Sequence, residues 1–482
     1  MSVPVGRTAH DVGSGLSRGA SRTRINRLAR RALPLAAAAA LVAAVQGGMS
    51  AGAASANAPH ATLHTAIPVP DVSRPIKIGK QLPAPISTAA CRARFGISCY
   101  TPQQYHTAYD LNPLYDSGIT GAGRTIVIVD SFGSPTIASD ISTFDTQFGL
   151  PPLDLTIDQF GTIPPFDPTN ATIVGWAEET SLDVEYAHAI APGAKIVLAE
   201  TPVAETEGTT GLPEMMNAEQ TLIDSGVGDV ISQSFGATEN TFPGFSQGDY
   251  SSLLSLRHAF KDALVHRVTV LGASGDAGVT DAEADGTTLY PYRVNSWPSC
   301  DPLVTSVGGT RLYLDANGNR LQPDSVWNDG FGAGGGGVSA VFDRPLFQVG
   351  VAGVVGSHRG TPDISMTAAV NGAAWVYWSF AGGGGPGWEL VGGTSEATPV
   401  FSGVVALADQ LAGHRLGWIN PDLYLLGALS QHTGLPTGIV DVTTGNNYFG
   451  GVTGYDAVGG YDLASGWGTI DADKFVHALA RL

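Results

Sequence analysis

Short apolar runs that alternate with helix-like stretches constrain the fold of this 482-residue chain more than any other feature. Most of these runs are apolar at nearly every position, not at every second one. Strands of that kind belong to parallel sheets that are covered on both faces. The strand candidates are 125–130, 195–200, 229–234, 267–272 and 303–307.

Helix patterns separate the runs, for example over 181–190 and 251–266. This order predicts one large α/β domain with a doubly wound, mostly parallel sheet flanked by helices. In such sheets the functional side chains gather at the carboxyl ends of the strands. The glycine-rich stretch 325–387 is expected to form loops around a cleft.

Charge excludes one class of function. The chain has 25 Lys and Arg against 43 Asp and Glu, and its formal net charge is −18. The first 57 residues hold seven of the arginines and one aspartate, so the remainder carries a net charge of −24. A surface this acidic repels phosphates, and we expect no nucleic-acid partner. It suits work in acid, where carboxylates are neutralised, and it equally suits solubility alone.

The amino end has the order of a secretory signal. Five arginines between 22 and 31 precede an apolar run over 33–45, and small residues follow over 51–58. The run is shorter than the roughly 20 residues of a membrane-spanning helix. We therefore expect 1–57 to be a signal peptide and 58–96 to be a linker or reduced pro-segment. The mature protein should be secreted, extracellular, free of the membrane and monomeric, with one domain over 97–482.

Three cysteines are present. Cys91 and Cys99 are eight positions apart and could close a small disulfide in an oxidising compartment. Cys300 would then be unpaired, and we expect it to be packed and unreactive. No Cys/His spacing suggests zinc.

Ser395 stands in a Gly-Gly-Thr-Ser turn ahead of an apolar-periodic helix that has Pro399 in its first turn. The amino terminus of a helix favours negative charge, so it is a suitable position for a nucleophile. Taken alone, however, a serine in this position is more often a helix cap.

A serine nucleophile needs a base, and no His-Gly-Thr-His motif is present. Glu179 and Asp183 are four apart and therefore share one face of a helix. Two carboxyls so close repel each other, so one pKa rises and the pair can share a proton at mildly acid pH. The alternative is a solvated acidic face, which Glu178 and Glu185 fit better.

Asp276 lies in a Ser-Gly-Asp turn after the strand candidate 267–272. A protonated carboxyl there could donate a hydrogen bond to a developing oxyanion. Taken alone, an aspartate in such a turn is usually only a turn former.

Together these motifs resemble the sedolisin, or serine-carboxyl, peptidase family, whose fold is subtilisin-like. The resemblance runs from about Cys99 to the carboxyl end and includes further blocks at 182–185, 191–194, 307–310, 334–339, 345–348 and 359–365. It implies a serine-type endopeptidase that cleaves proteins or peptides in acid. It also implies that Ser395 is the nucleophile, Glu179 the base coupled to Asp183, and Asp276 the oxyanion residue.

The carboxyl-terminal region suggests a metal. Two carboxylates about 20 residues apart, flanked by glycines, suit a hard cation such as Ca²⁺. The family resemblance implies one structural calcium ion, held by the side chains of Asp441 and Asp462 and the carbonyls of Val442, Val458 and Gly460.

Two departures from the family pattern concern the surroundings of the carboxyls. Asp130 stands where relatives often have Glu, and Phe235 where Trp is frequent, so we expect the pKa tuning to differ. Two alternatives stay open: a His-dependent subtilisin-like peptidase that uses His188, and a non-catalytic, calcium-binding peptidase-like module.

Overall fold

The structure is a computed structural model that describes residues 76–482. The predicted signal peptide and residues 58–75 of the predicted linker lie outside this part. None of the described helices is long and apolar enough to cross a membrane.

A sheet of eight strands forms the centre of the described part. Its order is β11-β10-β8-β6-β3-β5-β4, and β14 pairs with β10. Every neighbouring pair is parallel except β10 with β11. The sheet confirms the predicted α/β fold. The strands are β3 (Thr125–Ser131), β4 (Asp154–Gln159), β5 (Lys195–Thr201), β6 (Val230–Gln233), β8 (Thr269–Ala273), β10 (Thr305–Arg311), β11 (Ser325–Val326) and β14 (Ile364–Thr367).

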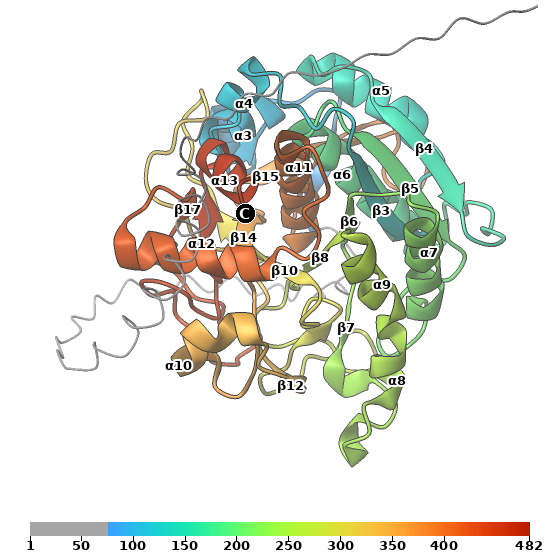
Figure 1. Cartoon of the computed structure of the whole chain (residues 1–482). Coiled ribbons are helices and arrows are strands. Elements are labelled where there is room, and N and C mark those ends of the chain that lie inside the picture. The colour runs from blue at the N-terminus through green and yellow to red at the C-terminus, as the bar shows by residue number, and fades with distance from the viewer. Residues whose placement is uncertain (1–75) are drawn as a thin grey trace, which may run out of the picture. The chain divides into compact units, whose positions relative to one another are not determined.

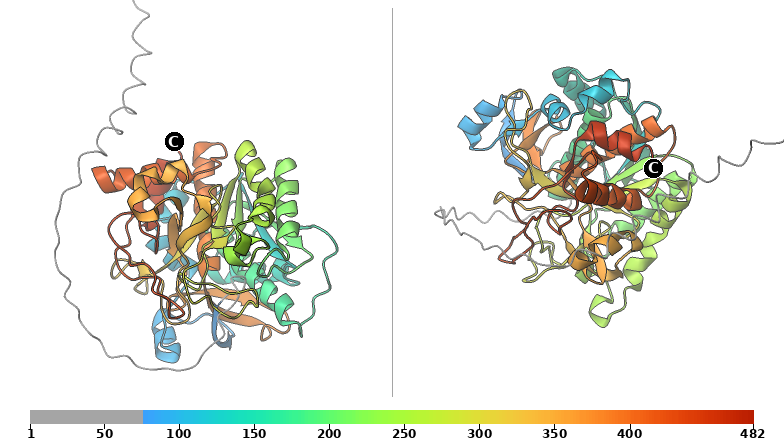
Figure 2. Two further views of the ribbon diagram at one scale, coloured as in Figure 1. Left: turned by 90° about the horizontal axis from the view of Figure 1, so that it is seen from below. Right: turned by 60° about the vertical axis from the view of Figure 1, so that its left-hand side comes forward.

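Alternate residues of the central strands enter two different cores. In β3, Ile126 and Ile128 belong to the core that contains α6 and α11, whereas Val127 and Val129 belong to the core that contains α7 and α9. Figure 1 shows α11 and α7 on opposite sides of the strands, and the two views of Figure 2 show the same arrangement. Burial on both sides explains why these strands are apolar throughout. The helices are α6 (Ala171–Ile190), α7 (Leu212–Asp224), α9 (His258–His266) and α11 (Thr394–Ala412).

Helix α6 is enclosed on all sides. It packs against the large sheet, against α11 and α5 (Ile137–Phe148), and against a smaller sheet of order β1-β16-β15-β2. Every residue from Ile173 to Ile190 is consequently buried. The interpretation of Glu178 and Glu185 as a solvated face is therefore wrong. Glu178 pairs with Lys77 at 2.6 Å, and Glu185 accepts a hydrogen bond from the backbone N–H of Tyr377.

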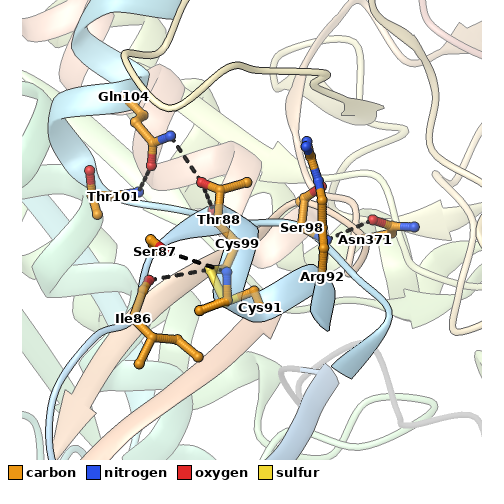
Figure 3. Close-up of a disulfide and its surroundings, with 12 residues drawn as sticks. Ile86, Ser87, Thr88, Cys91, Arg92, Ser98, Cys99, Thr101, Gln104 and Asn371 are labelled. Atoms are coloured by element: carbon orange, nitrogen blue, oxygen red, sulfur yellow. Dashed lines mark hydrogen bonds between the residues drawn. A yellow bond between two sulfur atoms is a disulfide. The ribbon is translucent and has the colours of Figure 1, made fainter. Parts of the chain in front are cut away.

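Part of the predicted linker is regular structure. Strand β1 (Ile76–Leu82) pairs antiparallel with β16 (Gly387–Gly392), and helix α2 (Thr88–Phe95) follows. A disulfide joins Cys91 of α2 to Cys99 of β2 (Cys99–Tyr100), as Figure 3 shows. The interpretation of 76–96 as linker is wrong because partners about 300 residues away in the sequence, invisible to local periodicity, hold this segment.

The glycine-rich stretch also contains strands, contrary to the prediction of loops. They are β11, β12 (Gly337–Asp343), β13 (His358–Thr361), β14, β15 (Ala373–Trp378) and the first residue of β16. Some glycines permit close backbone approach: a Cβ on Gly335 would lie 1.9 Å from the carbonyl oxygen of Ser274. The predicted helix 251–266 is divided into α8 (Ser251–Leu254), a 3-10 turn and α9.

Short elements complete the described part. Cys300 is buried and unpaired, as expected, and its thiol donates to Glu239 Oε1 at 3.2 Å. The remaining principal elements are α3 (Pro102–Ala108), α4 (Asn112–Asp116), β7 (Ala237–Thr238), β9 (Ser296–Trp297), α10 (Ala352–Val355), α12 (Asn420–Thr433), β17 (Ile439–Val440), β18 (Thr469–Ile470) and α13 (Ala472–Leu479).

Candidate active site

Ser395 is the second residue of α11 and is 1% exposed. It makes no capping hydrogen bond, so the interpretation of Ser395 as a helix cap is wrong. The residue before the helix is Gly393, with φ 135°. A Cβ there would lie 2.6 Å from Asp276 Oδ2, so the close approach of Asp276 to the helix start requires glycine.

Asp276 lies in the loop after β8 and faces the start of α11. Its Oδ1 accepts hydrogen bonds from the backbone N–H and the hydroxyl of Thr394, at 2.7 and 2.8 Å. Burial raises the pKa of Asp276 to about 7, although the bonds from Thr394 oppose the rise. The carboxyl therefore holds a proton in acid, and Oδ2 is the oxygen left to carry it.

Glu179 and Asp183 are both fully buried on α6. Burial is the largest cause that raises the pKa of each carboxyl well above its ordinary value, and neighbouring carboxylates add to it. The Ser395 hydroxyl is near enough to lower the Glu179 pKa. The Ser395 hydroxyl and the Glu179 carboxyl do not form a direct hydrogen bond of normal geometry. Such contacts often tighten only when substrate binds.

Asp130 is a further member of this cluster. It is fully buried at the carboxyl end of β3, and its charge raises the pKa of both Glu179 and Asp183. Its own pKa is raised to about 7, mainly by burial. Phe235, by contrast, packs in the apolar core of α7 and α9. Asp130 is therefore part of the carboxyl network, and Phe235 brings no polar group to it.

Ser234 is a site residue that the sequence interpretation missed. Its Oγ lies 3.0 Å from Asp183 Oδ1 and 3.4 Å from the carbonyl oxygen of Ser395. Pro399 is the sixth residue of α11, not in its first turn as predicted, and it lacks the N–H that would bond that carbonyl. The alternation along 229–234, which places Ser234 on the face of Val230 towards α6, could have revealed it.

The His188 side chain contacts groups other than Ser395. Its ring is fully buried, and Nε2 lies 2.9 Å from the carbonyl oxygen of Pro151 and 3.2 Å from Asp145 Oδ1. Within residues 76–482, no histidine forms a hydrogen bond with the Ser395 hydroxyl. The geometry therefore gives no support to a His188-dependent mechanism.

The predicted calcium ligands converge on one loop. Asp441 Oδ2 accepts from the N–H of Gly460, and Asp462 Oδ2 accepts from the N–H of Val458, both at 2.8 Å. Burial raises the pKa of Asp462 to about 6. No Lys or Arg in the described range forms an ion pair with either carboxylate. Nor do three or more His, Cys, Asp or Glu side chains cluster there as a metal site. Two carboxylates plus carbonyls such as that of Val442 fit calcium without such a cluster.

Comparison with known proteins agrees with this geometry. The Subtilase family model matches residues 169–433. Kumamolisin of Bacillus sp. (strain MN-32) is 31% identical over 397 residues, which cover 79% of this chain and 64% of that protein. Sedolisin of Pseudomonas sp. (strain 101) is 30% identical over 386 residues, with coverage of 78% and 60%.

A solved structure of Pseudomonas sedolisin, a serine-carboxyl proteinase in complex with two molecules of pseudo-iodotyrostatin, matches with a TM-score of 0.66. The identity is 28%, and the match covers 80% of this chain and 99% of that one. The chain spans about three fifths of the length of the two curated relatives. The chain belongs to the subtilase family and, within it, to the sedolisin, or serine-carboxyl, type.

Proposed function

We propose that this protein is a serine-type endopeptidase that hydrolyses peptide bonds of proteins or peptides at acid pH. The observation that carries the proposal is the placement of the Ser395 hydroxyl among buried carboxyl groups. No Lys or Arg forms an ion pair with Glu179, Asp183 or Asp276 in the described part of the chain. Buried carboxyl groups without a counter-ion have raised pKa values, and a coupled pair such as Glu179 and Asp183 can share one proton in acid.

The reaction is an acyl transfer in two steps. Ser395 Oγ attacks the peptide carbonyl while Glu179, coupled to Asp183, accepts the hydroxyl proton. Protonated Asp276 and the backbone N–H of Ser395 donate hydrogen bonds to the oxyanion. The amine leaves with the proton from Glu179 and an acyl-enzyme remains. Water then attacks the ester and gives a proton to Glu179, which passes it to Ser395 Oγ as the acyl–oxygen bond breaks and the acid leaves.

The protonation states set the direction of the pH dependence. Because the pKa of Asp276 is raised to about 7, its oxyanion-stabilising proton is present in acid and lost as pH rises through that value. We expect kcat/KM to fall towards neutral pH. A maximum near pH 8 would contradict the scheme.

Purified protein incubated with a denatured protein at pH 3 to 5 tests the activity. Ser395→Ala should abolish cleavage, whereas Ser402→Ala, a buried serine on the same helix, should not. Glu179→Gln should likewise abolish cleavage, and Glu178→Gln is its neighbouring control. Circular dichroism checks that each variant is folded. Continued cleavage by folded Ser395→Ala would remove the nucleophile assignment.

The same assay separates the alternatives. A His188-dependent peptidase predicts that His188→Ala is inactive, whereas our scheme predicts cleavage by any folded His188→Ala protein. A non-catalytic module predicts no cleavage by the wild type at any pH.

We also propose one structural calcium ion, held by the side chains of Asp441 and Asp462 and the carbonyls of Val442, Val458 and Gly460. The ion would neutralise the two carboxylates and stabilise the fold. A chelator should lower the melting temperature of the wild type but not that of Asp462→Ala. Equal melting with and without chelator would refute the site.

Export also remains a proposal, because the predicted signal peptide 1–57 is the basis for it and lies outside the described residues. Amino-terminal sequencing of protein recovered from the medium tests both export and the predicted boundary. Size-exclusion chromatography tests the expected monomer.

A further inference from the structure

A cavity of about 380 Å³ lies at the carboxyl ends of β3, β4 and β5. Its volume falls within the range of small-ligand pockets. The apolar side chains in its lining include those of Phe132, Ile157, Ile163, Phe166 and Ile173. Such walls suit an apolar portion of a ligand.

One carboxylate, that of Glu200, lines this cavity. Glu200 is 5% exposed, and its Oε2 accepts a hydrogen bond from Gln159 Nε2 at 2.8 Å. Among residues 76–482, no Lys, Arg or His forms an ion pair with it. Burial raises the pKa of Glu200, and a cation in the adjacent space would favour its charged form. The hydroxyl of Ser134, which also lines the cavity, has no hydrogen-bond partner in the same range.

The cavity adjoins the carboxyl network of the candidate active site. Glu200 is the register partner of Asp130 in the paired strands β3 and β5, and its charge contributes to the raised pKa of Asp130. Ile173, in the cavity wall, is six residues before Glu179 on α6, or about 9 Å along the helix axis. An extended peptide advances about 3.3 Å per residue, so about three residues span that distance.

The backbone beside the cavity is strained. Phe132 has φ 63°, and the N–H of Gly133 donates to the carbonyl of Ser131 at 2.7 Å. A bulky residue at positive φ in a three-residue turn is an unfavourable backbone conformation. Strain of this kind clusters at ligand-binding sites. Here the turn places Phe132 in the cavity wall. Gly133 is needed as well, since a Cβ there would lie 1.9 Å from Glu200 Oε1.

We propose that this cavity is a substrate subsite for a side chain with an apolar stem and a cationic end, lysine or arginine, and that Glu200 is its counter-charge. The inference rests on the proposed peptidase function and deepens it by naming a specificity-determining residue. A neutral occupant would leave the Glu200 carboxylate unpaired, whereas an ammonium or guanidinium group would pair with it. The free amino terminus of a peptide offers the same charge, and the experiment distinguishes the two sources.

The test compares quenched fluorescent peptides that carry either lysine or norleucine, which has a similar stem without the amine, at each position within four residues of the cleavage site. Each peptide is made with and without an amino-terminal acetyl group, and the assay runs at pH 5.5. We expect one position at which the lysine peptide has a kcat/KM about tenfold higher. Glu200→Gln should bring that ratio near one and leave the norleucine peptide within about threefold of wild type. Glu214→Gln, on α7, is the matched control.

A binding arm makes the test independent of turnover. The same peptides are titrated into Ser395→Ala and Ser395→Ala/Glu200→Gln. The lysine peptide should bind the first about tenfold more tightly than norleucine and the second equally. If wild type selects lysine in binding but cleaves nothing, the proposed function fails and the subsite stands. If unacetylated peptides bind more tightly than acetylated ones whether they carry lysine or norleucine, and Glu200→Gln removes this difference, the cation is the amino terminus and the lysine assignment is overturned. If Glu200→Gln changes no ratio by more than twofold, the proposal is overturned.

Discussion

Replacement of Ser234 by alanine removes a hydroxyl that lies beside the nucleophile Ser395, and we expect it to lower the stability of the fold. Its single proton can serve either Asp183 Oδ1, at 3.0 Å, or the Ser395 carbonyl, at 3.4 Å. Ser234→Ala removes the one hydrogen bond that this proton makes to a buried acceptor, and this loss costs about 1–3 kcal/mol of folding free energy. Unfolding entropy grows by about 2.1 cal/mol/K per residue, so a domain of roughly 400 residues should melt about 1–4 °C lower.

A double-mutant cycle with Pro399→Ala isolates the link to the nucleophile. Alanine at 399 restores a backbone N–H to the Ser395 carbonyl, so the loss of Ser234 should then cost about 1 kcal/mol less. The free energy of unfolding in urea at pH 4 is measured for the wild type, the two single variants and the double variant. Ser232→Ala is the matched control because its hydroxyl has no hydrogen-bond partner within 76–482. Equal costs of Ser234→Ala in both backgrounds would refute the reasoning.

The pH profile supplies a second readout. The Ser234 hydrogen bond lowers the pKa of Asp183, so its loss raises that pKa further. Because Glu179 and Asp183 are coupled, the acid limb of kcat/KM should move to higher pH. If Ser234 only supports the fold, the acid limb of kcat/KM should stay at the wild-type pH.

Three further predictions concern stability. Burial raises the pKa of Glu396, whose Oε1 accepts from Tyr105 at 2.5 Å, well above its ordinary 4.5. The folded state thus keeps this proton to higher pH than the unfolded state, so its stability is highest below pH 4.5 and falls as pH rises. Glu396→Gln should flatten part of that fall in urea titrations from pH 4 to 8, and an unchanged slope would contradict the assignment. The double replacement of Cys91 and Cys99 by alanine opens a loop with a separation of 8 residues and should cost about 2.5 kcal/mol by loop entropy, measured by denaturant unfolding. A cost below about 0.5 kcal/mol would show that the disulfide constrains little. Arg359→Met leaves Asp363, which its guanidinium contacts twice at 2.5 Å in a fully buried pair, without a counter-ion. It should therefore cost about 3–5 kcal/mol in calorimetry, whereas Arg344→Met, which removes an exposed contact, should cost little.

Local sequence was a good guide wherever neighbouring residues decide the structure. The apolar runs predicted β3, β5, β6, β8 and β10 to within a few residues, because burial on both faces leaves a signal in the strand itself. Strand β4 was missed because all of its side chains are partly or fully exposed at the sheet edge, so it lacks the continuous apolar run of the central strands. Strand β1 was missed because its pairing partner, β16, is about 300 residues away in the sequence.

The candidate active site also has features that local sequence predicted and features that depend on tertiary contacts. The sequence by itself determined which chemical groups are present: a serine after glycines, two carboxyls one helical turn apart, and an aspartate after a strand. Only the tertiary structure decided that α6 is enclosed by two sheets and α11, so that Glu179 and Asp183 are buried and their pKa values are raised. It also brought Ser234 to Asp183 and Glu200 beside Asp130. Burial and contacts between distant segments are collective properties of the packed chain, and a pKa depends on both.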